Sequence, residues 1–301
     1  MIYTVTFNPA IDYVMHLDKL NEGMINRSNA EEIVSGGKGI NVSTVLTNLG
    51  IDNIALGFCA GFTGQAIENG VRSSGVKTDF IHLKSGFSRI NVKIRAEQDT
   101  DINGQGPKIE AGDIEELHKK LNALKSGDIL VLAGSIPNTL PGDIYENIIK
   151  RLDGRGIRFV VDATGQLLVK VLKYRPFLIK PNNDELNEIF GRQLESDDEI
   201  IEHAKKLQNM GAENVLVSMG SRGAILVTAK GSLKRGIPSC GVVKNTVGAG
   251  DSMVAGFLYG YLKTNDYEYA LKTGTAAGSA TAFTIGVASK KEIEYVLSEL
   301  E

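Results

Sequence analysis

The sequence predicts an α/β fold in which a mostly parallel sheet is covered by helices on both faces. Short apolar, β-branched runs alternate along the chain with segments of helical periodicity, as in βαβ units. The runs are nearly continuous in apolar residues, which is typical of strands buried on both faces. A chain of 301 residues fits one such core with a small appendage.

The strands and helices of this core follow from the same pattern. Six predicted strands cover residues 2–7, 54–58, 129–133, 159–162, 177–180 and 215–218. Three predicted helices cover residues 38–49, 143–152 and 199–210. In the first helix, Ile40, Val45 and Leu49 share one side. Gly50 follows, and glycine is typical just past a helix C-terminus.

Two stretches depart from this alternation. Within residues 86–101, Ile90, Val92 and Ile94 alternate strictly with basic or polar residues, which predicts a half-exposed strand with one apolar and one polar face. Residues 13–17 form a weaker second example.

We expect these stretches to form a small β-sheet that projects from the main body as a lid or a dimer surface. Its strands should come from about residues 12–34 and 86–107. An ordinary surface hairpin is the alternative interpretation. Since no linker is long enough to separate domains, we expect residues 1–301 to form a single domain.

Composition excludes several classes of protein. The net charge of -3 gives no basic field for nucleic acid, and no apolar run reaches the roughly 20 residues of a membrane helix. Cys59 and Cys240 cannot make a disulfide framework, and the N-terminus has no basic leader. The four histidines share no metal-ligand spacing. We expect a cytoplasmic protein that acts on a small molecule, with neither nucleic acid nor membrane as its partner.

The stretch N-T-V-G-A-G-D, residues 245–251, carries the main catalytic hypothesis. Gly248, Ala249 and Gly250 precede Asp251, which opens an apolar segment with helical spacing. Backbone amides at a helix N-terminus bind anions, so this turn can hold a phosphoryl group while Asp251 takes a proton from the attacking hydroxyl. An aspartate that caps its own helix after a glycine turn explains the motif equally well.

Two common phosphate-binding motifs do not match. The glycine-rich segment 35–39 continues from Lys38 into glycine, where a P-loop requires Ser or Thr. The segment 248–253 ends in Met253, where the dinucleotide fingerprint requires glycine. A dehydrogenase is therefore disfavoured.

Two further segments are candidate binding sites. Gly36 and Gly37 allow a ligand to approach the backbone, and Lys38 and Asn41 add a cation and an amide for a sugar or a phosphate. A loop-to-helix turn with a solvated lysine is the alternative, and the segment alone favours it.

Lys180, Asn182 and Glu185 follow a predicted buried strand, at the edge where α/β sheets bind ligands. Asn182 and Glu185, three residues apart, can share a helix face and hold magnesium. An acid-rich helix N-terminus is the alternative. Residues 217–223 form another glycine turn after a strand.

Taken in this order, the motifs resemble the ribokinase-like, or PfkB, family of carbohydrate kinases over essentially the whole chain. The most specific segments are N-P-A-I-D at 8–12, G-G-K-G-I-N at 36–41, K-P-N at 180–182 with Glu185, and G-A-G-D-S at 248–252. The resemblance implies a ribokinase-like α/β fold, with a Rossmann-like sheet and a β-sheet lid. It also implies ATP and Mg²⁺ as cofactors and a homodimer formed through the lid.

Within the family, residues 61–64, 88–93 and 102–107 resemble members that phosphorylate the C6 hydroxyl of D-fructose 1-phosphate, giving fructose 1,6-bisphosphate and ADP. The alternatives are a tagatose-6-phosphate kinase or a 6-phosphofructokinase of the same family. A non-catalytic sugar-phosphate sensor is less favoured because Asp251 and its glycine turn are present.

The resemblance also assigns roles to single residues. Asp251 would be the catalytic base, beside an anion hole formed by the amides of Gly248, Ala249 and Gly250. The substrate-binding residues would be Asp12, Gly36, Gly37 and Asn41 for the sugar, and Lys38 and Arg89 for its phosphate. The ATP site would be lined by Lys180, Asn182, Ser218, Gly220, Gly223 and Ser279. Glu185 and Asn182 would organise the magnesium ion.

Overall fold

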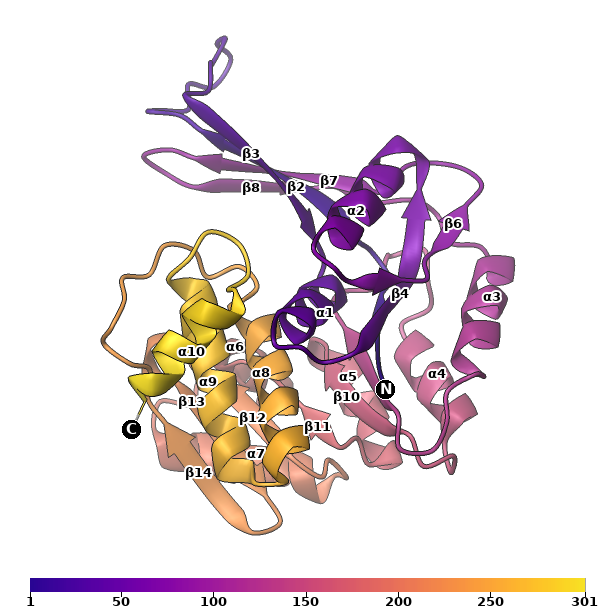
Figure 1. The fold of residues 1–301 in the computed structure, drawn as a ribbon, viewed down its shortest axis with the longest axis vertical. Helices are drawn as coiled ribbons and strands as arrows, with labels where there is room; N and C mark the ends of the chain where they lie inside the picture. Colours follow the sequence, from indigo (N-terminus) through magenta and orange to yellow (C-terminus); the bar gives the residue numbers. More distant parts are fainter. Residues whose placement is uncertain (301) are drawn as a thin grey trace.

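A computed structural model describes residues 1–300 and contains two sheets, a large one flanked by helices and a small one that stands above it (Figure 1). The ten strands of the large sheet are β1 (Ile2–Thr6), β4 (Asn53–Ala60), β5 (Lys77–Thr78), β6 (Ile81–Leu83), β9 (Ile129–Ala133), β10 (Arg158–Asp162), β11 (Leu178–Ile179), β12 (Val215–Ser218), β13 (Ala224–Thr228) and β14 (Gly231–Arg235). The four strands of the small sheet are β2 (Ala10–His16), β3 (Ala30–Gly36), β7 (Arg89–Arg95) and β8 (Thr100–Asn103).

The order of the large sheet is β14-β13-β12-β11-β10-β9-β1-β4-β5, with β6 paired to β4. All pairs from β12 to β5 are parallel, and the pairs β12–β13 and β13–β14 are antiparallel. The chain begins at β1 and proceeds to β4 on one side and to β9 on the other, so the strand order reverses at β1. Open α/β sheets bind ligands at such a point, beyond the carboxyl ends of the strands.

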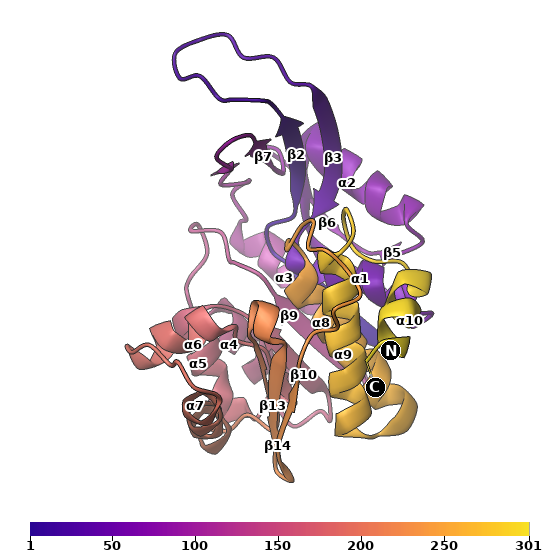
Figure 2. The same ribbon diagram turned by 90° about the vertical axis from the view of Figure 1, so that its left-hand side faces the viewer.

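Helices cover both faces of the large sheet (Figure 2). One layer contains α3 (Ala111–Leu121), α4 (Ile144–Leu152), α5 (Gly165–Val171), α6 (Asn183–Phe190) and α7 (Asp197–Asn209). The other contains α1 (Lys38–Asn48), α8 (Ala249–Thr264), α9 (Tyr267–Ala282) and α10 (Lys290–Ser298). The helix α2 (Gly61–Ser73) packs against β4 and the small sheet. Within residues 1–300, no helix is long and apolar enough to cross a membrane.

Most predicted elements agree with the structure to within a few residues. The strands at 129–133 and 215–218 match, as does the start of α1 at Lys38. The strand predicted at 177–180 is wrong in length, because β11 contains only two residues. Pro181 has no backbone N–H for a ladder, and it ends the strand early. The helix α7 begins two residues before its prediction, since the Ser196 side chain accepts a hydrogen bond from the Glu199 amide.

The small sheet contains a hairpin where the sequence predicted one strand over residues 86–101. The strands β7 and β8 pair antiparallel across a turn at residues 96–99. The Arg95 guanidinium contacts the carboxylates of Asp99 and Asp101 at 3.6 and 2.9 Å. These contacts join the two strands beside the turn. Because β8 pairs antiparallel with β7, the prediction of a single strand over this stretch is wrong.

The predicted two-faced character of the small sheet is confirmed. Ile33, Tyr13, Val92 and Ile102 pair in register across β3, β2, β7 and β8, so they form one apolar row on the same face. Ile33 and Ile102 are 71% and 57% exposed. The opposite face carries the basic and polar side chains of β7, which line a cavity. The polar face is therefore the functional candidate.

Candidate active site

A cavity of about 1010 Å³ lies between the small sheet and the carboxyl ends of the central strands. Segments far apart in the sequence meet there, because the lid strands, α1, the ends of β11 and β12, and the start of α8 all border it. The predicted site residues that line this cavity are Asp12, Gly37, Lys38, Asn41, Arg89, Lys180, Asn182, Ser218, Gly220, Gly248, Ala249, Gly250, Asp251 and Ser279.

Three predicted site residues are not part of this lining. Gly36 lines a neighbouring cavity of about 870 Å³, which lies on the other side of Asp12, Asn41 and Lys93. Gly223 packs against the backbone carbonyl of Arg235, where no side chain fits, so its small size serves the β-hairpin. Glu185 is turned back toward its own helix terminus, as described below.

Asp251 lies in the first turn of α8 and is 5% exposed. Gly248 precedes the helix with a φ of 82°, a left-handed conformation that favours glycine. The Asn41 side-chain amide donates a hydrogen bond of 2.8 Å to Asp251 Oδ2. The N-cap of α8 is Gly248 and Asp251 is the third helical residue, so the alternative interpretation of Asp251 as the N-cap is wrong.

The same turn has fewer free donors than the sequence predicted. The Ala249 amide donates to the Thr246 carbonyl at 3.2 Å, so it is not available to an anion in this conformation. The cationic group of Lys180 compensates, since its Nζ lies 3.1 Å from the position that a Cβ on Gly250 would occupy. A helix N-terminus and a lysine therefore meet beside Asp251.

The pKa of Asp251 is raised to about 6. Burial is the largest cause, followed by the negative charge of Asp162, whereas the Asn41 hydrogen bond and the charges of Lys38 and Lys180 oppose the rise. A carboxylate with this pKa is ionised at neutral pH and accepts a proton more readily than an ordinary aspartate.

Asp162, at the end of β10, binds both lysines. Its Oδ1 lies 3.0 Å from Lys38 Nζ, and its Oδ2 lies 3.3 Å from Lys180 Nζ. Burial opposes the ionisation of Asp162, but the charges of Lys180 and Lys38 prevail and hold its pKa below the usual value. Burial likewise disfavours the charge on Lys38, yet Asp162 and Asp251 raise the pKa of that lysine.

The lid side of the cavity holds a carboxylate and an arginine. The Asn91 side-chain amide donates to Asp12 Oδ1 at 2.7 Å, and Asp12 Oδ2 lies 2.7 Å from the position that a Cβ on Gly36 would occupy. Arg89 donates through Nε to the Asn8 carbonyl at 3.0 Å. Burial lowers the pKa of Arg89, while the nearby charge of Asp12 opposes that shift. This wall can bind sugar hydroxyls and an anionic group.

Asn182 and Glu185 form a reciprocal cap on α6. The backbone N–H of Glu185 donates to Asn182 Oδ1 at 2.7 Å, and the backbone N–H of Asn182 donates to Glu185 Oε2 at 2.8 Å. Within residues 1–300, no three His, Cys, Asp or Glu side chains gather as a metal site. The described part of the chain thus provides no group of three such side chains that could enclose a metal. These residues fit only a magnesium ion that takes most of its ligands from phosphates and water.

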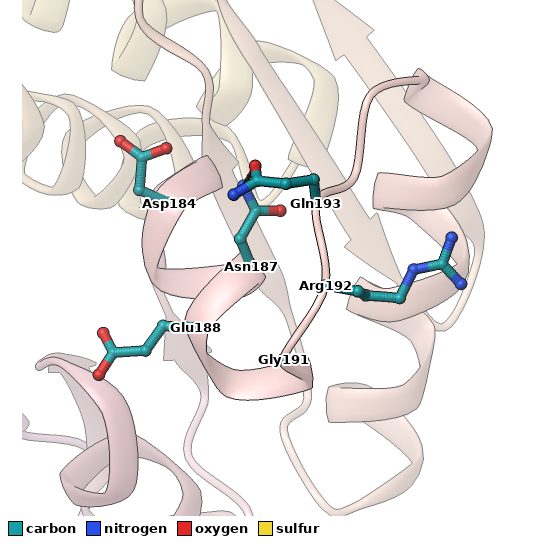
Figure 3. Close-up of a pocket in the computed structure, with 6 residues that line it drawn as sticks. All are labelled: Asp184, Asn187, Glu188, Gly191, Arg192 and Gln193. Atoms are coloured by element: carbon teal, nitrogen blue, oxygen red, sulfur yellow. Dashed lines mark hydrogen bonds between the residues drawn. The ribbon is translucent and has the colours of Figure 1, made fainter.

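A smaller hollow of about 510 Å³ lies along α6 and shares only Asp184 with the main cavity (Figure 3). The Asn187 amide donates to Gln193 Oε1 at 2.9 Å, and Arg192 points away from the two acids, Asp184 and Glu188. Arg192 is paired with Glu199 instead. None of the predicted site residues lines this hollow, and we assign it no function.

Comparisons with known proteins identify the family. The model of the pfkB family of carbohydrate kinases matches residues 5–294. The chain belongs to this family. It is 43% identical to 1-phosphofructokinase from Bacillus subtilis (strain 168), over 100% of this chain and 99% of that protein. It is 36% identical to D-tagatose-1-phosphate kinase from Bacillus licheniformis, over 100% of this chain and 99% of that protein.

A solved structure agrees with this assignment. Phosphofructokinase-2 from Escherichia coli, in complex with substrates and products, superposes with a TM-score of 0.93 and is 28% identical, covering 99% of each chain. The ribokinase-like fold expected from the sequence is therefore confirmed. Membership in a carbohydrate kinase family implies ATP use. The glycine turns and lysines that line the cavity suit the phosphates of a nucleoside triphosphate.

Two residues of this kinase were missing from the predicted site. Asp162 ends a predicted strand at the edge of the sheet where ligands bind, so a signal for it was present. Lys93 is buried and lines both cavities, but the sequence pattern marked it only as part of a polar strand face. Whether that face meets solvent or a cavity depends on how the lid is oriented, which strand periodicity does not determine.

Proposed function

We propose that the chain transfers the γ-phosphoryl group of ATP to the C6 hydroxyl of D-fructose 1-phosphate, giving fructose 1,6-bisphosphate and ADP. One observation carries the proposal: Asp251 and the N-terminus of α8 face the same cavity as Arg89 of the small sheet and Lys38 of α1. The full-length similarity to a 1-phosphofructokinase supports this choice of substrate.

Asp251 acts as the general base in this proposal. Its carboxylate accepts the proton of the C6 hydroxyl while that oxygen bonds to the γ-phosphorus and the bond to the ADP oxygen breaks. Asn41 holds one carboxylate oxygen by its hydrogen bond of 2.8 Å, which fixes the orientation of the other toward the substrate. The free amides of the turn at 248–250 and Lys180 stabilise the charge that moves with the phosphoryl group.

The substrate lies against the lid. Asp12, held by Asn91, binds sugar hydroxyls together with Asn41 and the backbone at Gly37. Gly36 does not line this cavity, and its small size leaves room for the Asp12 carboxylate. Arg89 and Lys38 bind the phosphate already on the sugar, because both are cations on the cavity wall.

The nucleotide lies on the other side of Asp251. We assign its contacts to the predicted residues of that wall, which are Lys180, Asn182, Ser218, Gly220, Gly223 and Ser279. Gly223 contributes by shaping the turn, since it does not line the cavity. Mg²⁺ neutralises phosphate charge when bound, and Asn182 and Glu185 are the residues that would hold it, with Glu185 offering the oxygen that the cap leaves free.

The chain as a whole is proposed to be one kinase domain that dimerises through its lid. The apolar row Ile33–Tyr13–Val92–Ile102 lies on the lid face opposite the site, where a second copy can cover it. Cys59 and Cys240 are both free thiols, which suits our proposal of a cytoplasmic, reducing location.

A substrate panel tests the proposed function. Purified protein is assayed for ADP release with ATP, magnesium and one of five sugars: fructose 1-phosphate, fructose 6-phosphate, tagatose 6-phosphate, tagatose 1-phosphate or fructose. We expect the highest kcat/KM with fructose 1-phosphate. Tagatose 1-phosphate belongs in the panel because a relative of 36% identity is named for it. A preference for any other sugar contradicts the substrate assignment.

A further inference from the structure

Asp162 is fully buried and does not line the cavity, yet it contacts two of the cavity's cations. Its exposed fraction is 0%, and its two oxygens lie 3.0 Å from Lys38 Nζ and 3.3 Å from Lys180 Nζ. Because substrate cannot touch this carboxylate, any effect of Asp162 on the reaction must pass through the lysines or through its charge.

The two lysines come from different elements and both lie near the candidate base. Lys38 is the first residue of α1, the helix whose Asn41 holds Asp251. Lys180 follows β11 and lies against Gly250 in the first turn of α8. A single carboxylate at the end of β10 thus links a cation on the proposed sugar side to a cation on the proposed nucleotide side.

We propose that Asp162 is a positioning residue that holds Lys38 and Lys180 beside Asp251 and tunes the basicity of Asp251 through its own negative charge. This inference rests on the proposed function, in which Asp251 is the base. A buried ion pair is rarely more stable than an apolar replacement, so stability alone does not account for a carboxylate at this place.

The charges that face Asp251 support the same conclusion. They are Asp162 from β10, Lys38 from α1 and Lys180 from β11, and the neutral Asn41 donates a hydrogen bond. Asp162 raises the pKa of Asp251, whereas both lysines lower it. Removal of the Asp162 charge would leave two cations beside Asp251 and lower its pKa.

The test compares pH profiles of kcat/KM for the wild-type protein and Asp162→Asn, with whichever sugar phosphate the wild type accepts. The base must be ionised, so we expect the acidic limb of the variant to lie about one pH unit lower, the usual size of an effect from one nearby charge. The substrate phosphate also titrates near pH 6. Because the same substrate is used in both assays, its titration affects both pH profiles equally. A difference between the two profiles therefore reflects a change in the protein. An unshifted limb in a folded Asp162→Asn variant overturns the proposal.

Glu68→Gln is the matched control. Glu68 is also a buried carboxylate with two nitrogen partners, Arg72 at 2.7 Å and His82 at 3.0 Å, but it belongs to α2 and does not line the cavity. We expect this variant to lower the melting temperature and to leave the pH profile in place. A Glu68→Gln profile shifted as far as that of Asp162→Asn would show that any lost buried charge has this effect, and would contradict the proposal.

A stability measurement tests the ion pair between Asp162 and Lys180 and needs no activity assay. Asp162→Asn leaves Lys180, only 4% exposed, without its anionic partner. The double variant Asp162→Asn/Lys180→Met removes that buried cation as well, so it should melt higher or give more folded protein than Asp162→Asn alone. A double variant that is no more stable contradicts the link. Failure of the proposed function can be distinguished from failure of the role proposed for Asp162. If the proposed function is wrong, the wild type phosphorylates no sugar of the panel, whereas the stability comparison still tests the ion pair.

Discussion

At the scale of single residues, the site depends on how one carboxylate is kept both buried and ionisable. Asp251 is 5% exposed, and its pKa of about 6 results from burial and the Asp162 charge, opposed by Asn41 and two lysines. Each of these neighbours shifts the pKa of Asp251 in a defined direction. The acid–base behaviour of the enzyme is therefore predictable in sign.

The pH dependence provides the first prediction. Because the base must be ionised, kcat/KM should fall about tenfold per unit below pH 6. Asn41→Ala removes a hydrogen bond that favours the charged form, so the pKa of Asp251 should rise and the acidic limb should move to higher pH. The profiles of both proteins, measured on the same substrate, check the sign. A limb that moves to lower pH in Asn41→Ala would be inconsistent with the assigned hydrogen bond.

The proposed contact between Arg89 and the substrate phosphate provides the second prediction. A charge-assisted hydrogen bond contributes roughly 1.5–3 kcal/mol, so Arg89→Ala should raise KM for the sugar phosphate by about ten- to a hundredfold and leave KM for ATP unchanged. Arg95→Ala is the control, since Arg95 is on the same strand but is paired with Asp101 and lines only the neighbouring cavity. If KM rises only for ATP, the assignment of Arg89 is wrong.

At the scale of elements, α8 and α9 approach each other so closely that small residues are required between them. A Cβ on Gly256 would lie 2.5 Å from the Thr273 carbonyl oxygen and 2.7 Å from the Ala277 side chain. This contact places the start of α8, with Asp251, beside Ser279 on α9, and both line the cavity. The geometry of the site therefore depends on the packing of this helix pair.

Gly256→Ala tests that packing. Alanine usually stabilises a helix by roughly 0.5–1 kcal/mol relative to glycine, but the contact with backbone atoms should cost about 1–3 kcal/mol and lower the melting temperature. Gly112→Ala in α3 is the matched control, because nothing lies within 4 Å of its Cβ position. It should be neutral or slightly stabilising. Equal melting temperatures for the two variants would refute the close approach.

The elements also show what the sequence could and could not predict. The strand at 129–133 and the glycine turn before Asp251 were predictable, because apolar runs and helix-start chemistry are local. The hairpin at residues 96–99 was missed because the alternation of apolar and polar residues predicts a strand without showing where the chain turns back. Asp162 was missed because its partners, Lys38 and Lys180, come from segments 124 and 18 residues away.

At the scale of the whole molecule, the lid has two chemically different faces. Its polar face carries Arg89, Asn91 and Lys93 into the cavity, and its outer face exposes the row Ile33–Tyr13–Val92–Ile102. Exposed apolar sheet faces of this kind are typical of interfaces. In our proposal, one sheet serves both substrate binding and dimerisation.

The oligomeric state provides the fourth prediction. The wild-type protein should behave as a dimer in size-exclusion chromatography with light scattering, and Ile33→Glu should shift it toward the monomer because a charge would be buried at the interface. Met210→Glu, a similar change at an exposed residue at the end of α7, should leave the dimer intact. A wild-type monomer, or an Ile33→Glu dimer of unchanged stability, would exclude the lid as the interface.

The most direct test of the central claim is the turnover of Asp251→Asn. The amide keeps the shape of the side chain but cannot accept the hydroxyl proton. We therefore predict that kcat falls by at least about a hundredfold, while ATP binding, measured by calorimetry, is retained. Asp99→Asn, a change of the same kind in the neighbouring cavity, should keep most of the activity. A folded Asp251→Asn protein with near wild-type kcat would contradict the role of Asp251 as the base.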